Sequence, residues 1–291
     1  MKIIEPNVTE VTDFEGVDNF YKAVARAARI CYASDKTTDD KELCERLIKS
    51  KHFSPFEHAI IYVSCKNINE LGKTNNNSTE YQVLNNARNC IKYIVDKYNK
   101  EEQHYELAIN GRVLIETVLD HSDYPMQTLD GTLQLMKQFE LDKHWFKSFI
   151  VDTSIGCTRE MNRHHDNFYI CEQSTRFCNF SKNKFGNEVA FNKPYWYDGS
   201  SFNKEFIWTD AMLAAENAYL CAIKNDVPID IARGVLPLDT HTRAIYTATI
   251  EEWNHIIDLR LKGTTGKPHG DIKVIAEKIN NLLYDNNKSV K

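Results

Sequence analysis

Apolar positions recur at helical spacing over much of the chain, while a few shorter segments are rich in β-branched and aromatic residues. The segment 17–32 is the clearest helical case, because it contains no glycine or proline inside its repeat. We expect helices over 17–32, 39–50, 80–98, 102–119, 204–224, 251–261 and 271–285. We expect strands over 58–66, 147–152 and 240–250.

Breakers and polar stretches separate these elements. Pro228 suits the first turn of a further helix, which Pro237 ends. The run KTNNNST at 73–79 indicates an exposed loop. Because two predicted helices follow this loop, we expect a mostly helical insertion at about 69–144 within a single domain, 1–291. Helices and strands mix without regular alternation, which favours the α+β class.

The composition is ordinary for a globular protein. The 291 residues are 42% hydrophobic and 26% charged, so the chain can form a full core. A net charge of −5 argues against nucleic-acid binding through a general basic surface. No apolar run approaches the roughly 20 residues of a membrane helix, and residues 1–11 lack an apolar signal-peptide core. We therefore expect a cytoplasmic protein without membrane or nucleic-acid partners.

Eight cysteines are scattered along the chain, and none belongs to a Cys-x-x-Cys motif. The usual signature of zinc ribbons and thioredoxin-like redox sites is therefore missing. A chain of this length also has little need for a disulfide framework. We expect reduced cysteines and no metal site.

Reactive side chains concentrate in 159–181, whose sequence is REMNRHHDNFYICEQSTRFCNFS. Arginine forks suit phosphate and planar carbonyl groups because they donate two parallel hydrogen bonds. Glu172, Gln173 and Ser174 offer donors and acceptors that distinguish one base edge from another. The segment therefore indicates an anionic ligand such as a nucleotide, although a solvated surface loop would contain the same residue types.

Three other segments carry polar groups that need an explanation. HFSPFEH at 52–58 places two histidines in a proline turn before a strand. ARGVLPL at 232–238 places Arg233 in an apolar helix end, where a charge should meet an anion, a carboxylate or solvent. Arg260 closes a predicted helix, and its ordinary explanation is a cation placed at a helix C-terminus.

Together and in this order, these segments resemble the flavin-dependent thymidylate synthases. That family carries the signature Arg-His-Arg-x-x-Ser-x-Asn-Glu-x-Ser-x-Arg-Tyr, which compares with RHH at 163–165 followed by EQSTRF at 172–177. The turn at 52–58 is similar to the family's His-x-Ser/Thr-Pro-Phe-Glu-His. Further blocks that match are AAR at 27–29, ARGVLPL at 232–238 and DLR at 258–260. The similarity covers most of the chain outside the insertion.

The chain also departs from the family signature. The distance from the first arginine to the serine is one residue longer, His165 replaces an arginine, and Phe177 replaces the final tyrosine. A shifted register, with His164 and His165 in the first two positions, also fits the sequence. A neutral imidazole offers one donor where guanidinium offers five, so we expect reduced or pH-dependent flavin affinity.

The resemblance implies the family's α+β fold, with a mixed sheet and flanking helices, assembled as a homotetramer with active sites at subunit interfaces. It implies conversion of dUMP to dTMP, with methylenetetrahydrofolate as carbon donor, FAD as hydride carrier and NADPH as reductant. The matching positions imply flavin contacts for Ser54, Arg163, His164, His165, Glu172 and His255. They imply nucleotide contacts for Glu160, Arg163, Glu172, Gln173, Ser174, Thr175, Arg176, Arg233 and Arg260.

The resemblance gives Arg260 the most specific role. It matches the arginine assigned to ionising the uracil ring at N3, where a guanidinium favours the ring anion and makes C5 nucleophilic. Hydride passes directly from reduced flavin to the pyrimidine, so no cysteine has to act as a nucleophile. Ser174 is then a ligand group, because no general base is assigned to it.

Two other functions stay open on the sequence. A degenerate member of the family would bind nucleotide or flavin without turnover. Alternatively, the chain would be a helical phosphohydrolase with a His/Asp metal site formed by His164, His165 and Asp166. This alternative does not explain the motifs at 52–58, Arg233 and Arg260.

Overall fold

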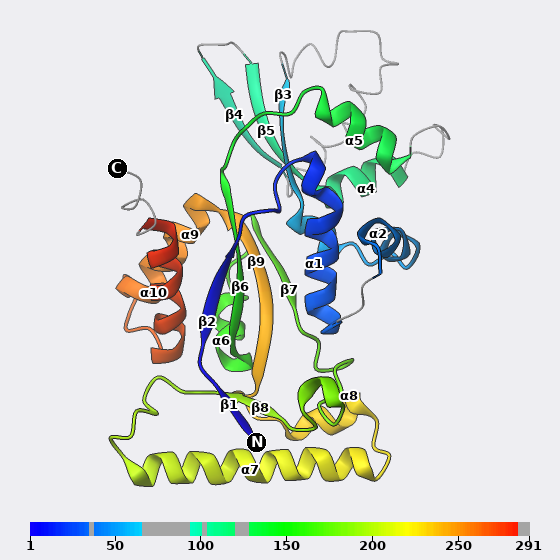
Figure 1. The fold of residues 1–291 in the computed structure, drawn as a ribbon. Helices are drawn as coiled ribbons and strands as arrows, with labels where there is room; N and C mark the ends of the chain where they lie inside the picture. Colours follow the sequence, from blue (N-terminus) through cyan, green and yellow to red (C-terminus); the bar gives the residue numbers. More distant parts are fainter. Residues whose placement is uncertain (35–37, 66–93, 101–103, 120–127, 285–291) are drawn as a thin grey trace.

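The structure is a computed structural model that describes residues 1–34, 38–65, 94–100, 104–119 and 128–284 (Figure 1). The strands are β1 (Lys2–Ile4), β2 (Asn7–Val11), β3 (Ile60–Cys65), β4 (Ile94–Asn99), β5 (His104–Asn110), β6 (Phe146–Ser154), β7 (Phe168–Glu172), β8 (Ala190–Asn192) and β9 (His241–Thr249). The helices are α1 (Phe20–Tyr32), α2 (Asp40–Lys49), α4 (Gly111–Leu119), α5 (Leu129–Lys137), α6 (Ile155–Met161), α7 (Phe202–Lys224), α8 (Ile229–Ala232), α9 (Ile250–Ile257) and α10 (Gly270–Tyr284).

A four-stranded sheet with the order β2-β6-β9-β7 forms the centre of the molecule, and its three pairings are antiparallel. β1 pairs with β8 in parallel, and a bridge between Phe191 and Thr240 joins β8 to the start of β9. Both pairing directions therefore occur around the central sheet. The α+β class with flanking helices is confirmed.

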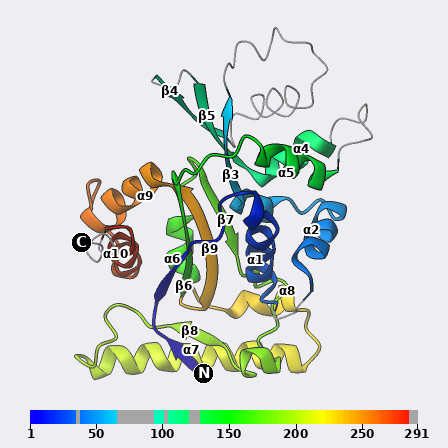
Figure 2. The ribbon, with the colours of Figure 1, turned by 45° about the horizontal axis from the view of Figure 1, so that its top comes forward.

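Alternating side chains of the central sheet face two different cores. Cys171 and Ile245 pack with α1, whereas Phe168 and Tyr246 pack with α9 and α10. Figures 1 and 2 both show α1 on one side of β6 and β9, and α9 and α10 on the other. A third core lies against α7 and includes Trp208.

Most of the periodic segments are confirmed as helices, namely α1, α2, α7, α9 and α10. The strands expected over 58–66, 147–152 and 240–250 are confirmed as β3, β6 and β9. Pro228 precedes α8 as its N-cap, and the helix ends before Pro237. The sequence pattern missed the shorter elements, which are β1, β2, β7, β8, α5 and α6.

The second sheet, with the order β3-β5-β4, corrects part of the predicted insertion. Helix was expected over 80–98 and 102–119, and this is wrong for β4 and β5. β5 contains three consecutive buried apolar residues, Leu107 to Ile109, and such a run has no period that separates a buried strand from a helix.

The helical part of this segment begins with α4. The Asn110 side-chain oxygen accepts hydrogen bonds from the amides of Arg112 (3.1 Å) and Val113 (3.3 Å), which ends β5 and starts α4. In the described residues, the insertion therefore contains the helices α4 and α5 together with two strands. The loop expected at 73–79 and residues 80–93 of the predicted helix lie outside the described residues.

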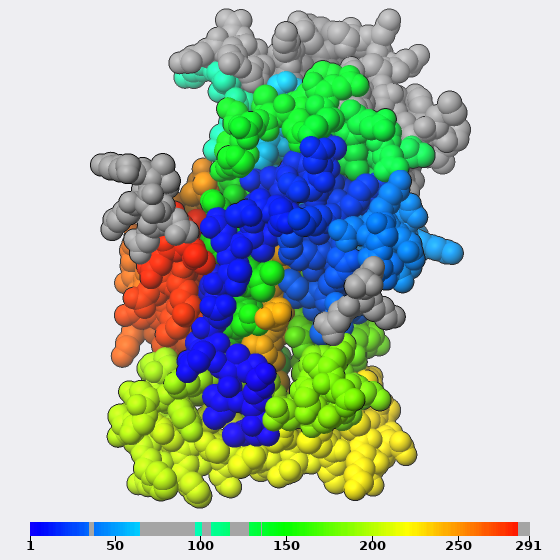
Figure 3. All heavy atoms as spheres, in the orientation of Figure 1, coloured from blue at the N-terminus to red at the C-terminus, as the bar shows by residue number. Residues whose placement is uncertain are grey.

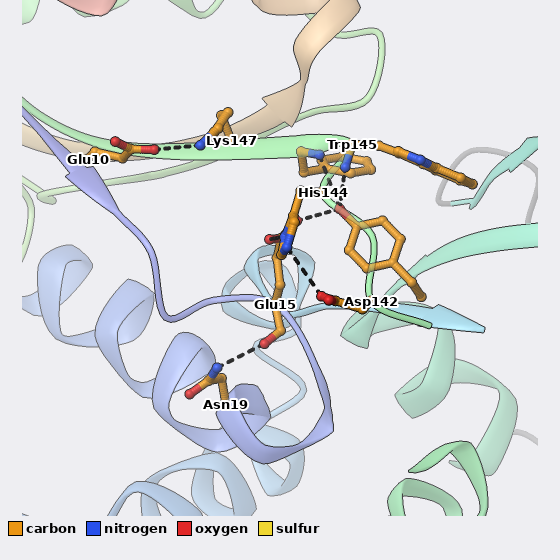
Figure 4. Close-up of polar contacts among 9 residues, drawn as sticks. Glu10, Glu15, Asn19, Asp142, His144, Trp145 and Lys147 are labelled. Carbon is orange, nitrogen blue, oxygen red and sulfur yellow. Dashed lines mark hydrogen bonds and ion pairs between the residues drawn. The ribbon is translucent and has the colours of Figure 1, made fainter. Parts of the chain in front are cut away.

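A polar cluster joins the second sheet to the central one (Figure 4). The Tyr62 hydroxyl donates to Glu15 and accepts from the amides of Trp145 (2.9 Å) and Phe146 (3.1 Å). His144 Nδ1 lies 2.7 Å from the other Glu15 carboxylate oxygen. Burial raises the pKa of the Glu15 carboxyl above its usual value. We call Glu15, Tyr62, His144 and the amides of Trp145 and Phe146 the Glu15 cluster. Its hydrogen bonds hold together three segments that are distant in the sequence.

Candidate active site

The segment 159–181 folds as the end of α6, a tight turn, β7 and a loop. Ser154 begins α6, because its hydroxyl accepts a hydrogen bond from the Cys157 amide (3.2 Å). Asn167 adopts a positive φ of 50°, a conformation that asparagine tolerates, and this turns the chain into β7. The turn brings the end of α6 back beside β7.

Arg260 is held by residues from this segment. Its Nη2 donates to the backbone carbonyl of Glu160 (3.2 Å), and its Nη1 lies 3.4 Å from the Glu160 carboxylate. Its Nε donates to His164 Nε2 at 3.3 Å. His164 Nδ1 in turn lies 3.3 Å from the Glu252 carboxylate. We call Glu160, His164, Glu252 and Arg260 the Arg260 cluster.

This arrangement fixes the roles of the two nitrogens of His164. Arginine cannot accept a hydrogen bond, so His164 Nε2 accepts, and Nδ1, which faces the Glu252 carboxylate, carries the ring hydrogen. His164 is 6% exposed, whereas the Arg260 side chain keeps 20% of its surface exposed. Arg260 lies in a π-helical turn, Asp258–Lys262, which continues α9; such turns are frequent at functional sites.

Glu172, at the end of β7, is held by side chains of the α6 segment. Thr158 Oγ1 lies 2.8 Å from one carboxylate oxygen, and Asn162 Nδ2 lies 3.4 Å from the other. The Tyr246 hydroxyl donates to Asn162 Oδ1 at 3.2 Å, and burial raises the pKa of Tyr246 well above its usual value. The Glu172 carboxylate is therefore oriented by two donors on one helix face, four residues apart.

The proline turn at 52–58 is a 3-10 turn, and its two histidines differ. His58 is fully buried, its Nδ1 lies 2.9 Å from Thr247 Oγ1, and burial lowers its pKa to about 3. It is a core residue. His52 instead lies 2.9 Å from the Tyr32 hydroxyl and 3.2 Å from Ser54 Oγ. Only the His52 end of the turn therefore offers polar groups near the surface.

The loop that follows β7, residues 173–177, is tied to other elements; we call it the serine loop. The Ser174 amide donates to the Cys31 carbonyl (2.9 Å), and its hydroxyl accepts from the Arg176 amide (3.3 Å). Arg233 Nη1 donates to Thr175 Oγ1 at 3.1 Å. The Arg176 guanidinium lies 5.4 Å from the centre of the Phe177 ring, and both side chains are exposed. The Phe177 ring also lies 6.0 Å from the Tyr32 ring, which places the serine loop beside His52 and Ser54.

The structure thus sorts the predicted residues into two groups. Arg260 contacts both Glu160 and His164, and the His255 ring lies 5.8 Å from that of His164. We place Glu172 in the same group because Thr158 and Asn162, from the segment that carries Glu160, hold it. The second group contains Ser54, Gln173, Ser174, Thr175, Arg176 and Arg233. Between residues that the structure describes, no side-chain hydrogen bond or ion pair joins the two groups. Figures 1 and 2 show α8, which leads into Arg233, and α9, which leads into Arg260, on opposite sides of β6 and β9.

Two predicted residues lie outside both groups. Arg163 is exposed, and the polar partner of His165 among the described residues is its neighbour Asp166, at 3.1 Å, with the side chains of His165 and Asp166 both 83% exposed. No described contact joins Arg163, Arg176, Arg233 and Arg260, and their convergence around one ligand stays a prediction.

Sequence reasoning missed four residues of this region: Tyr32, Thr158, Asn162 and Glu252. Thr158 and Asn162 share the helical spacing of one face, but their partner Glu172 ends β7, which the pattern did not predict. Glu252 stands beside Glu251 in the first turn of α9, where an acid is ordinary at a helix N-terminus, so its burial could not be recognised from the sequence.

Two features are absent from the described residues: a cluster of metal ligands and a membrane-spanning helix. Within the described ranges, no set of three or more His, Cys, Asp and Glu side chains is placed to hold a metal ion. No helix in the part of the chain that the structure describes is long and apolar enough to cross a membrane.

Comparison with known proteins gives consistent matches. The family model described as thymidylate synthase complementing protein matches residues 15–71 and 74–286. The flavin-dependent thymidylate synthase of Aquifex aeolicus (strain VF5) is 23% identical over 305 residues, which cover 89% of this chain and 93% of that protein. A probable flavin-dependent thymidylate synthase of Paramecium bursaria Chlorella virus 1 is 26% identical over 152 residues, covering 47% of this chain and 70% of that protein.

Among solved structures, a match is the UMP/dUMP methylase PolB from Streptomyces cacaoi bound with 5-Br dUMP. The alignment covers 98% of this chain and 93% of the PolB chain. The TM-score is 0.44 and the identity is 17%.

Proposed function

The chain belongs to the thymidylate synthase complementing protein family, and on this premise we propose that it is a flavin-dependent thymidylate synthase. The reaction would be reductive methylation of dUMP to dTMP, with methylenetetrahydrofolate as carbon donor and NADPH as reductant. The observation that carries the proposal is the Arg260 cluster. It unites residues from two motifs that lie about a hundred positions apart.

Arg260 is suited to hold a pyrimidine ring. The Glu160 carbonyl and His164 Nε2 fix the orientation of the guanidinium plane, and because the printed contacts engage three of its five N–H donors, the group can donate to a further acceptor. Beside N3 and its adjacent carbonyl, this cation would favour the ring anion and so raise the nucleophilicity of C5. The arginine needs no reorganisation when the nucleotide arrives, because its hydrogen-bond partners already position it.

The serine loop supplies groups for the phosphate end of the nucleotide. Arg176 is exposed, and the Thr175 hydroxyl already contacts Arg233. Exposed guanidinium groups next to serine and threonine hydroxyls form a donor set that suits a phosphate. The Ser174 hydroxyl contacts the Arg176 amide and no histidine or carboxylate of the described chain, so we assign it to binding rather than to nucleophilic attack.

The residues also fit a flavin. Exposed donors at Arg163 and His165 suit a diphosphate, and Ser54 and His52 offer small polar groups beside the Tyr32 ring. When bound, FAD would supply the hydride that reduces the methylene group transferred to the pyrimidine. The chain's own contribution would be to bind and orient both rings.

A complete site needs both groups of residues, and we propose that they come from different copies in a homotetramer. Exposed apolar side chains occur in two places: Phe202, Phe206 and Ile207 at the N-terminal end of α7, and Ile231, Val235 and Leu238 around Arg233. An exposed apolar surface of this kind is typical of a subunit interface.

The first experiment combines an absorbance spectrum with product analysis. Purified protein should show a flavin band, oxidise NADPH in a dUMP-dependent way, and form dTMP that mass spectrometry detects when methylenetetrahydrofolate is present. A flavin band without dTMP would instead indicate a binding homologue without turnover. Stoichiometric transition metal without flavin would favour the phosphohydrolase.

A pair of arginine variants tests the site itself. Arg260→Ala should retain flavin and lose dTMP formation. Arg46→Ala, which removes an exposed arginine of α2, should behave like the unchanged protein. Full dTMP formation by Arg260→Ala would overturn the proposed role.

A further inference from the structure

A cavity of about 710 Å³ lies apart from the Arg260 cluster, on the face of the molecule shown in Figure 3. In that view, atoms of β6 (green) and β9 (orange) are visible in a hollow between the blue N-terminal strand and α1. Its walls come from β1, α1, β9 and the segment around Lys184. Its volume lies within the range of small-molecule sites.

The cavity is positively charged although the chain as a whole carries a net charge of −5. Six cationic side chains line it, against the two carboxylates Asp40 and Glu188. The cations are Lys2, Lys22, Arg26, Arg29, Lys184 and Arg243. Like charges that surround one hollow raise the local concentration of counter-ions.

The carboxylates near the cavity do not neutralise all of these cations. Arg29 pairs with Asp40 at 2.7 Å and Arg243 pairs with Asp152 at 2.8 Å. Lys22 and Arg26 share one carboxylate, that of Asp13, at 2.5 Å each. The Lys184 ammonium donates to an uncharged backbone carbonyl at 2.8 Å. The Lys2 side chain has no hydrogen bond or ion pair with any residue that the structure describes. Positive charge therefore stays available to a ligand.

The remaining wall is apolar and partly aromatic. Phe180 and Phe185 meet edge to face, with ring centres 5.2 Å apart, and Ile30 and Ile150 also line the hollow. The Lys184 ammonium lies 4.9 Å from the centre of the Phe185 ring, so charge and ring face the same space. A ligand that fits both features has an anionic end and a flat, less polar body.

We propose that this cavity binds a nucleoside polyphosphate. The phosphates lie against Lys2, Lys184 and the arginines of α1, and the base lies against the Phe180–Phe185 wall. Arg26 and Arg29 are three residues apart on one helix face, which suits contacts with neighbouring phosphate groups. This site is not the one assigned to dUMP.

The two sites are adjacent at one point. Gln173, assigned above to the substrate, also lines the cavity, and its amide donates to the Arg243 carbonyl at 2.8 Å. A test therefore has to be made with the substrate site filled. Binding is measured directly, so failure of this inference is distinguishable from failure of the proposed enzyme activity.

The probes are ATP, inorganic triphosphate and citrate, titrated calorimetrically into the full chain with and without saturating dUMP. ATP should bind more tightly than triphosphate because of the aromatic wall, and citrate should bind least. Affinity for both phosphates should fall as salt is added. Displacement of ATP by dUMP, absence of ATP binding at millimolar concentration, or equal affinity for ATP and citrate would each overturn the proposal.

A charge-reversal pair locates the site. Lys2→Glu combined with Lys184→Glu should weaken ATP binding by at least about tenfold. The matched control combines Lys204→Glu with Lys273→Glu, which makes the same charge change at exposed positions outside the cavity. Thermal unfolding verifies that both variants fold. Equal ATP affinity in the two double variants would place the ligand elsewhere and contradict the assignment.

Discussion

The Glu15 cluster and the Arg260 cluster each combine a histidine and a carboxylate with a third polar side chain, Tyr62 or Arg260, yet they differ in how much hydrogen-bonding capacity remains free. In the first, the Tyr62 hydroxyl donates once and accepts twice, so its hydrogen-bonding capacity is full (Figure 4). In the second, Arg260 makes three contacts of 3.2–3.4 Å and keeps part of its surface exposed.

This difference separates a structural role from a binding role. The Glu15 cluster bonds chain segments to one another, so its loss should change the free energy of unfolding. The Arg260 cluster positions one cation and leaves it able to bind a further acceptor, so its loss should change turnover. Substitutions in each cluster can be compared by both measurements.

The largest expected effect belongs to Arg260→Ala. Loss of a preoriented donor at the reacting ring should lower kcat for dTMP formation by at least about 10²- to 10³-fold. Arg260→Lys should be intermediate, because it keeps the charge without the planar fork. The rate of dTMP formation and the free energy of unfolding in urea are measured for each variant. If Arg260→Ala lowers the free energy of unfolding by as much as it raises the activation free energy, the contrast between the two clusters is lost.

Tyr62→Phe should show the opposite behaviour. The substitution leaves Glu15 and two buried amides with one partner fewer, so the free energy of unfolding should fall by about 1–3 kcal/mol. Urea denaturation measures the loss, and the Kd for dUMP measures the site. Weakened dUMP binding in folded protein would show that this cluster also shapes the site.

Ser174→Ala should have a smaller effect, on binding alone. Removing one hydroxyl from the serine loop should raise the Kd for dUMP by roughly 3- to 10-fold, equivalent to about 0.5–1.5 kcal/mol, with residual turnover. Asn179→Ala, which alters a neighbouring polar side chain bonded to Ser181, is the control. Complete loss of chemistry with intact dUMP binding would count against a ligand role for Ser174.

The smallest effect is the pH dependence of the Glu15 cluster. Burial raises the Glu15 pKa above the usual 4.5, so its favourable contribution is complete below that pH and is lost as pH rises through the folded-state pKa. Glu15→Gln does not titrate. The unfolding free energy of the unchanged protein minus that of Glu15→Gln should therefore fall with rising pH and then become constant. A difference that rises with pH would show that ionised Glu15 is stabilised by its partners.

The sequence predicted those elements whose apolar period is set locally, such as α1 and α10. It failed for β5, where buried neighbours Leu107 to Ile109 give no period, and for β7, which is short and lies between two polar segments. For the site, the motifs identified Arg260, His164 and Glu160. Thr158 and Glu252 became recognisable only through their partners, because hydrogen bonds across elements depend on the packing of α6, α9 and β7.

The sequence also did not indicate how the predicted arginines are distributed. Arg260 and Arg233 follow helices on opposite sides of the central sheet, a consequence of chain topology. The central claim is therefore that one site combines the Arg260 cluster of one copy with the serine loop of another.

Co-expression of two defective chains tests this claim most directly. Arg260→Ala and Arg176→Ala should each have little activity alone. Mixed oligomers should recover about one quarter of the activity of the unchanged protein, since random mixing gives one site in four an Arg260 from an Arg176→Ala chain and an Arg176 from an Arg260→Ala chain. Co-expression of Arg260→Ala with the double variant Arg260→Ala/Arg176→Ala should recover none. If mass spectrometry shows mixed oligomers of the two single variants and their dTMP formation stays at the level of the separate variants, the claim is contradicted.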